Sequence, residues 1–252
     1  MKRDKITLKS SGEIEKLRES NVHVAEVLQI LTKEIKPGIT TADLERIAER
    51  EAARRKVRPA FKGYKGYPYC LCTSVNSQIV HGMPGKRELK DGDIVSIDFG
   101  VELNGYYGDS AVTVPVGTIT KEAERLLRIT KESLERAINA ARAGNQLSEI
   151  SAAVEQCVEQ DGFSVVRAFV GHGIGTELHE LPQVPNFVMP GLTVELKEGM
   201  VLAIEPMVNA GSADIDVLDD GWTAVTQDGE LSAHFEHSVA ITADGPYVLS
   251  RV

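Results

Sequence analysis

LKDGDIVSID at residues 89–98 returns in altered form as LKEGMVLAIE at residues 196–205. The two stretches begin 107 residues apart, and each ends on a carboxylate, Asp98 in the first and Glu205 in the second. If a duplicated fold brings these acids face to face, their charges repel strongly unless a cation or a proton lies between them. A metal site is therefore the first hypothesis for this chain.

A second pair of similar stretches supports the duplication. GITTADL begins at residue 38 and GNQLSEI at residue 144, which is an offset of 106 residues. Two nearly equal offsets indicate a repeated structural unit. We predict two pseudo-symmetric halves, about 1–117 and about 118–252. Because no linker rich in Pro, Gly or Ser separates the halves, we expect residues 1–252 to form a single domain.

Composition and charge exclude several classes of protein. The formal net charge is −9, whereas a nucleic-acid-binding surface needs a local excess of Lys and Arg, so no direct nucleic-acid role is expected. There is no apolar run of about 18 residues and no signal-peptide pattern, so we expect neither a membrane span nor export. The three cysteines, Cys70, Cys72 and Cys157, fit no disulfide framework, which favours a cytoplasmic location.

The apolar pattern predicts two helices in each half. A capping-box pattern at Ser10 precedes a helical period that ends near residues 36–38, and Thr41 is expected to cap a second helix. The second half repeats this arrangement, with helices at about 121–143 and 148–159. Strands are expected at about 70–81, 93–103, 106–116, 164–170, 200–209, 222–227 and 234–242. Helices followed by strands with short connections predict an α+β fold with an antiparallel sheet covered by helices.

Asn104 and Gly105 lie between two of these strands and predict a tight hairpin, because a type I′ turn needs positive φ at both central positions. With these two residues as the loop, Asp109 pairs with Gly100. Asp98 then lies two residues further along on the same face, roughly 7–8 Å from Asp109 at the backbone. Two carboxylates at this separation can converge on a cation.

Two further acids and three histidines adjoin apolar or glycine-rich segments. Glu205 ends an apolar run, Glu236 precedes another, and His172 lies within GHGIG. His179 follows that segment, and His81 ends a short apolar run. Four carboxylates and one imidazole suit two adjacent divalent ions, because bridging carboxylates hold the cations against their mutual repulsion. The sequence therefore predicts metal-assisted hydrolysis.

The order of these residues and the sequence around them resemble the type I methionine aminopeptidases of the pita-bread metallopeptidase family. The matching stretches are GYKGYP at 63–68, VHGMP at 80–84, DGDIVSIDFG at 91–100, GYYGDSAVT at 105–113, GHGIGTELHE at 171–180, IEPMVNAG at 204–211, DGWTAVT at 220–226 and LSAHFEHSVAIT at 231–242. The resemblance implies a pita-bread fold in a single catalytic domain. It also implies a monomeric hydrolase that removes the initiator methionine from nascent polypeptides, and it leaves a contact with the ribosome open.

The resemblance implies a dinuclear site with a role for each ligand. Asp98 would chelate one ion, Asp109 and Glu236 would bridge both ions, and His172 and Glu205 would complete the shell of the other. A water or hydroxide that bridges the metals would attack the first peptide carbonyl. Co, Mn, Fe(II) and Zn all suit mixed oxygen and nitrogen ligands, so the residues do not select one metal.

The resemblance also implies catalytic and substrate-binding roles. His81 and His179 would be catalytic residues that contact the substrate amide, where a hydrogen-bonding imidazole stabilises developing negative charge. They would also bind substrate, together with a methionine pocket formed by Tyr64, Tyr67, Cys72 and Trp222. Aromatic faces and a sulfur suit a flexible thioether.

Four other positions bear on the comparison with the family. Asn76 and Ser232 match a monovalent-cation site of the family, so one such ion is a further expected cofactor. Phe61 and Leu178 depart from the family pattern, and we expect both at the rim of the pocket.

Two alternatives remain open from the sequence. The first is a proline-directed peptidase of the same fold and metal set, which usually carries a large additional N-terminal domain. The second is a non-catalytic binding module on the same scaffold, which would be free to lose metal ligands although all five are present here.

Overall fold

Two pairs of α-helices form, one pair in each half of the chain. The computed structural model describes residues 5–252. Its helices are α1 (Ser11–Glu34), α2 (Thr41–Arg55), α3 (Lys121–Ala140) and α4 (Leu147–Gln160), with one short 3₁₀ turn, η1 (Tyr64–Gly66). Within this range no helix has both the length and the apolar character needed to cross a membrane. The prediction of two helices in each half is confirmed.

Capping residues explain where the first two helices begin. Ser10 precedes α1 as predicted, and its backbone N–H donates to the Glu13 carboxylate at 2.9 Å. The prediction that Thr41 caps α2 is wrong by one residue, because Thr41 is already helical. Thr40 is extended instead, and its Oγ1 accepts a hydrogen bond from the Asp43 N–H at 3.1 Å.

The third helix ends earlier than predicted. The sequence suggested a helix to about residue 143, but α3 ends at Ala140 because Ala141 leaves the helical region of φ and ψ. The chain then turns at Gly144, whose N–H donates to the Leu196 carbonyl at 2.9 Å. A tertiary contact with the second repeated stretch therefore overrides the local preference for helix.

The strands pair antiparallel throughout the described residues, which confirms the α+β class. The two largest sheets have the order β15-β14-β9-β7-β8 and β1-β4-β2, with β5 also paired to β4. The strands are β1 (Arg58–Pro59), β2 (Leu71–Val75), β3 (Gln78–Val80), β4 (Ile94–Leu103), β5 (Tyr106–Pro115), β6 (Ser164–Val165), β7 (Gly171–Gly173), β8 (Glu180–Val184), β9 (Val201–Ile204), β10 (Met207–Asn209), β11 (Ile215–Val217), β12 (Ala224–Thr226), β13 (Ser232–His234), β14 (His237–Thr242) and β15 (Gly245–Val248).

Several predicted strands prove to be interrupted. The segment 70–81 divides at Asn76, which adopts a left-handed φ of 58° between β2 and β3. The segment 200–209 divides at Glu205 and Pro206, because proline has no N–H for the ladder. The segment 234–242 belongs to β13 and β14 with a break that includes Glu236, and only β6 forms within 164–170. Two of the predicted metal-binding acids thus lie where regular pairing stops.

Equivalent backbone contacts recur in the two halves. The Gly38 N–H donates to the Leu89 carbonyl at 2.8 Å, and the Gly144 N–H donates to the Leu196 carbonyl at 2.9 Å. These four residues belong to the two pairs of similar stretches. In each half, the glycine just before the second helix (α2 or α4) is bonded to the leucine a few residues before a long strand (β4) or its counterpart (β9). The sequence duplication is therefore also a duplication of structure.

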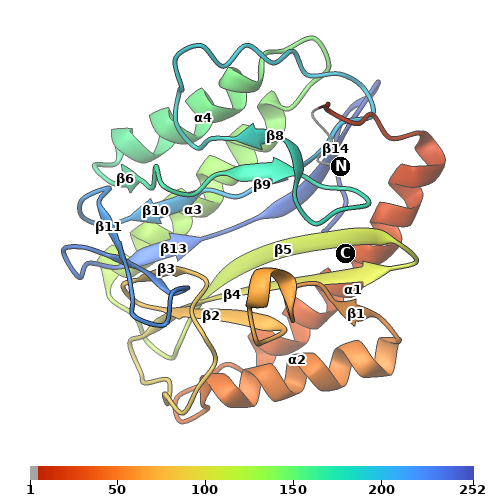
Figure 1. Cartoon of the computed structure of the whole chain (residues 1–252). Helices are drawn as coiled ribbons and strands as arrows, with labels where there is room; N and C mark the ends of the chain where they lie inside the picture. Colours follow the sequence, from red (N-terminus) through yellow and green to blue (C-terminus); the bar gives the residue numbers. More distant parts are fainter. Residues whose placement is uncertain (1–4) are drawn as a thin grey trace.

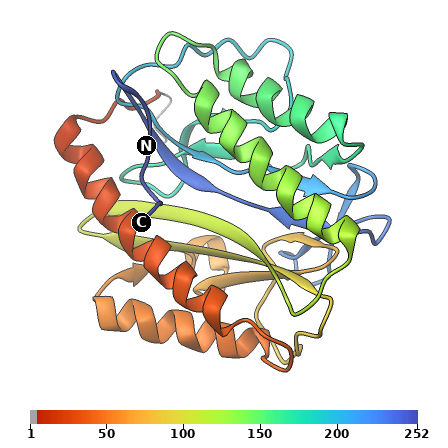
Figure 2. The ribbon, with the colours of Figure 1, turned by 180° about the vertical axis from the view of Figure 1, so that it is seen from behind.

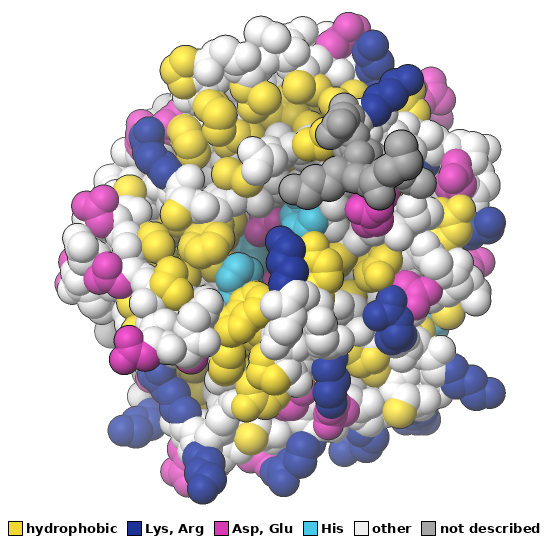
Figure 3. All heavy atoms as spheres, in the orientation of Figure 1, with side chains coloured by type: hydrophobic (Ala, Val, Ile, Leu, Met, Phe, Trp, Pro, Cys, Tyr) yellow, Lys and Arg dark blue, Asp and Glu magenta, His cyan; other side chains and the backbone are white. Residues whose placement is uncertain are grey.

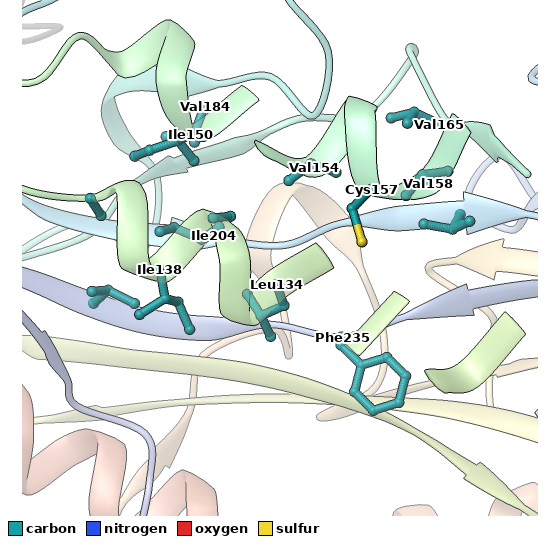
Figure 4. Close-up of a cluster of buried hydrophobic side chains, with 14 of the residues drawn as sticks. Leu134, Ile138, Ile150, Val154, Cys157, Val158, Val165, Val184, Ile204 and Phe235 are labelled. Atoms are coloured by element: carbon teal, nitrogen blue, oxygen red, sulfur yellow. The ribbon is translucent and has the colours of Figure 1, made fainter. Parts of the chain in front are cut away.

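Each helix pair covers its own part of the sheet structure. Seen from behind, α1 and α2 lie on one side and α3 and α4 on the other, all on the same face of the strands (Figures 1 and 2). In the second half, apolar residues of α3 and α4 pack toward the strands around Ile204 (Figure 4). A separate cluster joins α1 and α2 to β2 and β4. The helices thus leave the opposite face of the strands to form the site.

Candidate metal centre

All five predicted metal ligands line one cavity of about 140 Å³. On the face opposite the helices, Figure 3 shows a hollow with histidine and acidic side chains at its floor and hydrophobic side chains around it. The cavity is lined by Phe61, Tyr64, Lys65, Tyr67, Cys72, His81, Asp98, Asp109, His172, Leu178, His179, Glu205, Trp222 and Glu236. The fold therefore brings together side chains from both halves of the chain.

The β4–β5 hairpin places the first two acids. Its register pairs Gly100 with Asp109, as predicted from the Asn104–Gly105 turn, so Asp98 and Asp109 lie on one face. Cys72 on β2 pairs with Asp98 from the other side. The hairpin thus carries two carboxylates into the cavity beside one thiol.

Helix α1 packs closely against this hairpin and holds the Asp109 backbone. The Asp109 N–H donates to the side-chain oxygen of Asn21 at 3.3 Å. A side chain at Gly108 would bring its Cβ within 2.8 Å of the Asn21 nitrogen, so the close approach of helix and strand requires glycine there. The packing of α1 against β5 therefore fixes the backbone position of Asp109 at the cavity.

The other two acids lie at the strand interruptions of the second half. Glu205 follows β9, and its carbonyl accepts a hydrogen bond from the Asn186 side chain at 3.0 Å. Glu236 precedes β14, and its N–H donates at 2.9 Å to the carbonyl of Ala111, which lies two residues after Asp109 on β5. The Ser110 hydroxyl donates to the Glu236 carbonyl at 2.6 Å. These bonds join the halves across the floor of the cavity.

Donor atoms at the floor lie close together, and several of the carboxylate oxygens among them lack partners. Asp109, His172 and Glu236 each offer a ligand atom within 4.8 Å of the others. One carboxylate oxygen of each of Asp98, Asp109 and Glu236 is buried and has no hydrogen-bond partner among residues 5–252. Buried polar atoms are normally hydrogen-bonded, so unpartnered acceptors that converge in this way fit a cation.

Burial makes this group of acids costly to ionise. It raises the pKa of Asp98 and of Glu205 to about 7 in each case. Burial, with repulsion from the neighbouring carboxylates, raises the pKa of Asp109 and of Glu236 well above the ordinary range. Divalent ions would remove the penalty by supplying opposite charge. The carboxylate and imidazole donors suit such ions better than they suit a structural zinc site, which prefers thiolates.

Three histidines lie around the acids, and burial keeps two of them, His81 and His179, neutral. His172 lies on β7, with its Nδ1 2.9 Å from the Gly173 carbonyl and its Nε2 3.5 Å from the Glu205 carboxylate. Burial lowers the pKa of His81 to about 4 and that of His179 to about 3. His179 also packs against His172, with ring centroids 4.1 Å apart. Neutral imidazoles can coordinate a metal or exchange a proton at neutral pH.

The predicted methionine pocket forms the apolar wall. Tyr67 and Trp222 meet edge to face with ring centroids 5.1 Å apart, and Tyr64 stacks on His179 at 5.2 Å. Cys72 lies beside Asp98, and burial raises the pKa of its thiol, which stays neutral. Tyr64, Tyr67, Cys72 and Trp222 all line the cavity, as do Phe61 and Leu178, which were expected at its rim.

His234 belongs to this region although the sequence analysis assigns it no role. Its Nε2 lies 3.7 Å from the Glu205 carboxylate, and burial lowers its pKa. The signal that could have identified it is its position two residues before Glu236, since alternate residues of an extended chain point to one face. Phe169, which meets His81 edge to face at 5.4 Å, was also overlooked because nothing in the local sequence marks it.

Asn76 and Ser232 lie together away from this cavity. The Ser232 N–H donates to the Asn76 carbonyl at 2.9 Å, and the Asn76 amide donates to Asp93 at 2.8 Å. The Ser232 hydroxyl donates to the Val208 carbonyl at 3.2 Å. The two residues are therefore adjacent, and the monovalent-cation site remains a prediction.

A second group of possible ligand atoms, from Glu45, Glu49 and Cys70, has a structural explanation. The Glu45 carboxylate accepts hydrogen bonds from the backbone N–H of Cys70 at 2.9 Å and of Leu71 at 3.0 Å. Glu49 pairs with Lys62 at 2.5 Å. These acids are already engaged, in contrast to the unpartnered oxygens of the cavity.

Comparison with known proteins agrees with this geometry. The sequence pattern of metallopeptidase family M24 matches residues 15–243. The methionine aminopeptidase of Clostridium perfringens is 53% identical over 247 residues, which cover 98% of this chain and 99% of that protein. The crystal structure of methionine aminopeptidase from Thermotoga maritima has a TM-score of 0.96 at 46% identity, covering 98% of this chain and 100% of that one.

More distant structures share the fold alone. The prolidase from Pyrococcus furiosus has a TM-score of 0.79 at 23% identity, and the match covers 97% of this chain but 65% of that one. The pita-bread fold expected from the sequence is thus confirmed. With four buried carboxylates and a histidine converging in one cavity, and with a family match over most of its length, this chain belongs to metallopeptidase family M24.

Proposed function

We propose that this protein is a methionine aminopeptidase, a metal-dependent hydrolase that removes the initiator methionine from nascent polypeptides. The observation that carries the proposal is the cavity itself, where unpartnered buried carboxylate oxygens face an apolar wall of aromatic rings and a thiol. Such a cavity can hold cations on one side and a thioether side chain on the other. The 53% identity to the Clostridium perfringens enzyme, over nearly the full length of both chains, supports the same activity.

We assign the four acids and the one imidazole at the floor to two divalent ions. Asp98 would bind one ion, Asp109 and Glu236 would bridge both, and His172 and Glu205 would complete the second site. When bound, the ions would supply an activated water and polarise the scissile carbonyl. The donor set accepts Co, Mn, Fe(II) or Zn.

The protein's own side chains would bind and orient the peptide. The apolar wall, which includes Tyr67 and Trp222, would hold the methionine side chain. His81 and His179 would contact the peptide amide, because each neutral imidazole can donate one hydrogen bond and accept another. An imidazole donor directed at the carbonyl oxygen stabilises the charge that develops there, and it can also pass a proton to the leaving amine.

The proposal also covers the oligomeric state, the cellular location and a monovalent ion. The cavity is lined by residues from both halves of the chain, which supports a single catalytic domain over residues 1–252, and we propose that it acts as a monomer. Cys70, Cys72 and Cys157 are free and buried, which supports a reducing cytoplasm. Because nascent N-termini emerge at the ribosome, we propose that the enzyme works near it. We also propose a monovalent ion bound at Asn76 and Ser232.

Methionine release from short peptides tests the activity. We expect the protein loaded with Mn²⁺ or Co²⁺ to release methionine from Met-Ala-Ser but to leave Ala-Ala-Ser and an Xaa-Pro peptide intact. A chelator should abolish release, and added metal should restore it. The Asp109→Asn variant should keep its fold, as judged by circular dichroism, and lose activity. Cleavage of the Xaa-Pro peptide alone would favour a proline-directed enzyme, and no release at any metal loading would favour a binding module.

A further inference from the structure

Lys65 is a basic side chain at the cavity that the proposed mechanism does not use. It lines the cavity although the residue is solvent-exposed, which places it at the mouth. Among residues 5–252 it is the only Lys or Arg in the lining. Figure 3 shows a basic side chain at the edge of the hollow, beside a histidine.

Lys65 forms the outer end of a column of rings that leads down to the acids. Its ammonium lies 5.3 Å from the centroid of the Tyr64 ring, and Tyr64 stacks on His179 at 5.2 Å with an interplanar angle of 17°. His179 in turn packs against His172 at 4.1 Å, and His172 lies 3.5 Å from Glu205. The column thus extends from the solvent to the floor.

The length of this column relates the ammonium to positions in a bound peptide. An extended chain advances roughly 3.5 Å per residue, so the three contacts from the Lys65 ammonium to His172 correspond to at most about four residues. A peptide with its first carbonyl at the floor would bring its third or fourth residue to the level of Lys65. That part of the substrate would be solvent-exposed and free to vary in charge.

The local backbone holds Lys65 in this position. Its φ of 49° is in the left-handed region, which non-glycine residues seldom adopt and which occurs often at functional sites. The turn is closed by hydrogen bonds from the Tyr67 N–H to the Tyr64 carbonyl at 2.9 Å and from the Gly63 N–H to the Tyr67 carbonyl at 2.7 Å. The side chain therefore projects from a well-defined turn.

The charge of Lys65 is uncompensated, unlike that of its neighbour Lys62. The Lys62 ammonium pairs with Glu49 at 2.5 Å, outside the cavity. Lys65 has no ion-pair partner within residues 5–252, and its ammonium lies over the face of the Tyr64 ring. An unpaired ammonium at the mouth of the cavity is available for a carboxylate that the substrate brings.

We propose that Lys65 is a specificity-determining residue that favours peptides with a carboxylate at their third or fourth residue. This inference rests on the proposed aminopeptidase function and deepens it. The carboxylate can be an Asp or Glu side chain, or the free C-terminus of a short peptide, since both present the same anion to the ammonium. A basic residue at the same position is disfavoured by like charge.

Matched peptides and variants test the proposal. The peptides are C-terminally amidated, begin Met-Ala, and differ only in having Asp, Asn or Lys at the third or the fourth residue. The enzymes are the Mn²⁺-loaded wild type, Lys65→Asn and Lys65→Asp, because Asn and Asp tolerate the left-handed backbone. Lys62→Asn is the control, since it removes a nearby charge outside the cavity. A second arm compares Met-Ala-Ser with its amide to isolate the terminal carboxylate.

The expected result is a change in the ratio of kcat/KM for the Asp peptide to that for the Asn peptide. Lys65→Asn should lower this ratio about two- to fivefold at low salt, and Lys65→Asp should lower it further. The effect should shrink in 1 M salt, where the Debye length is about 3 Å. Lys62→Asn should leave the ratio unchanged.

Equal ratios in wild type and both Lys65 variants, at both positions and for the terminal carboxylate, would overturn the proposal. Methionine release from the neutral Asn peptide reports the basic activity separately, so failure of the proposed function is recognised independently. Binding of the same peptides to the Mn²⁺-loaded proteins, measured by calorimetry, gives a second readout. Affinities for the Asp and Asn peptides that do not respond to residue 65 would contradict the inference even if no methionine is released.

Discussion

Four carboxylates that share one small cavity determine how this protein responds to pH and to metal. Burial raises the pKa of each of them, to about 7 for Asp98 and Glu205. A group whose pKa is raised on folding is tolerated while protonated and destabilises the folded state once it ionises. The metal-free protein therefore carries an electrostatic cost at neutral pH that bound cations would remove.

Glu205 provides a direct test of this cost. Its unfolded pKa is near 4.5 and its folded pKa is about 7, so the penalty begins above pH 4.5 and is complete above pH 7. We expect Glu205→Gln to stabilise the metal-free protein by about 1–3 kcal/mol at pH 8 and to have little effect at pH 5. Chemical denaturation of both proteins at the two pH values, in the presence of a chelator, measures the difference.

The buried histidines do not affect the difference in stability between wild type and Glu205→Gln. Burial lowers the pKa of His81 to about 4 and that of His179 to about 3, so their contribution increases stability as the pH rises from about 3 to 6.5. That contribution is common to wild type and variant and cancels in the difference. If Glu205→Gln is less stable than wild type at pH 8 without metal, the ionised Glu205 carboxylate does not destabilise the metal-free folded protein, and the prediction is wrong.

At the scale of single elements, the β4–β5 hairpin shows what sequence can predict. The Asn104–Gly105 turn fixed the pairing of Gly100 with Asp109, because a two-residue loop leaves one register. The placements of Glu205 and Glu236 were less accessible, since both lie at interruptions of predicted strands. The contact of His234 with Glu205 joins different segments of the chain, so the only signal in the sequence is its position two residues before Glu236.

A buried ion pair ties the N-terminal segment to the loop that carries His179. Lys9 Nζ lies 2.6 Å from the Glu180 carboxylate, with side chains 4% and 5% exposed. The same carboxylate accepts a hydrogen bond from the Thr176 N–H at 2.9 Å. A Cβ at Gly175 would lie 2.4 Å from the Glu180 oxygen, so glycine is needed for this approach. The pair therefore organises the residues that precede His179.

Removing one charge of this pair should lower the free energy of unfolding strongly, whereas removing both charges should lower it little. We expect Lys9→Met to lower the free energy of unfolding by about 3 kcal/mol, because it leaves the Glu180 charge buried and unpaired. Lys9→Met combined with Glu180→Gln should regain most of the loss, since the amide oxygen can still accept the loop N–H. Denaturant unfolding of the metal-loaded proteins measures both values.

The exposed Lys62–Glu49 pair is the control for this experiment. Its side chains are 53% and 42% exposed, so Lys62→Met should cost less than about 1 kcal/mol. The interpretation fails if Lys9→Met lowers the free energy of unfolding no more than Lys62→Met does. It also fails if Lys9→Met combined with Glu180→Gln is as unstable as Lys9→Met alone.

At the scale of the whole molecule, the site exists because two similar halves meet. The first half contributes Asp98 and Asp109 on one hairpin. The second contributes His172 on β7, with Glu205 just after β9 and Glu236 just before β14. The hydrogen bonds between Ser110 and Glu236 and between Glu236 and Ala111 join the halves at the floor. The helices cover the opposite face of the strands, so the carboxylates can converge on the open face (Figure 2).

Anomalous diffraction from crystals loaded with Mn²⁺ tests this arrangement most directly. The account predicts two metal peaks in the cavity, with Asp109 and Glu236 between them, Asp98 on one peak, and His172 and Glu205 on the other. Peaks located elsewhere, or an empty cavity in crystals saturated with Mn²⁺, would contradict it.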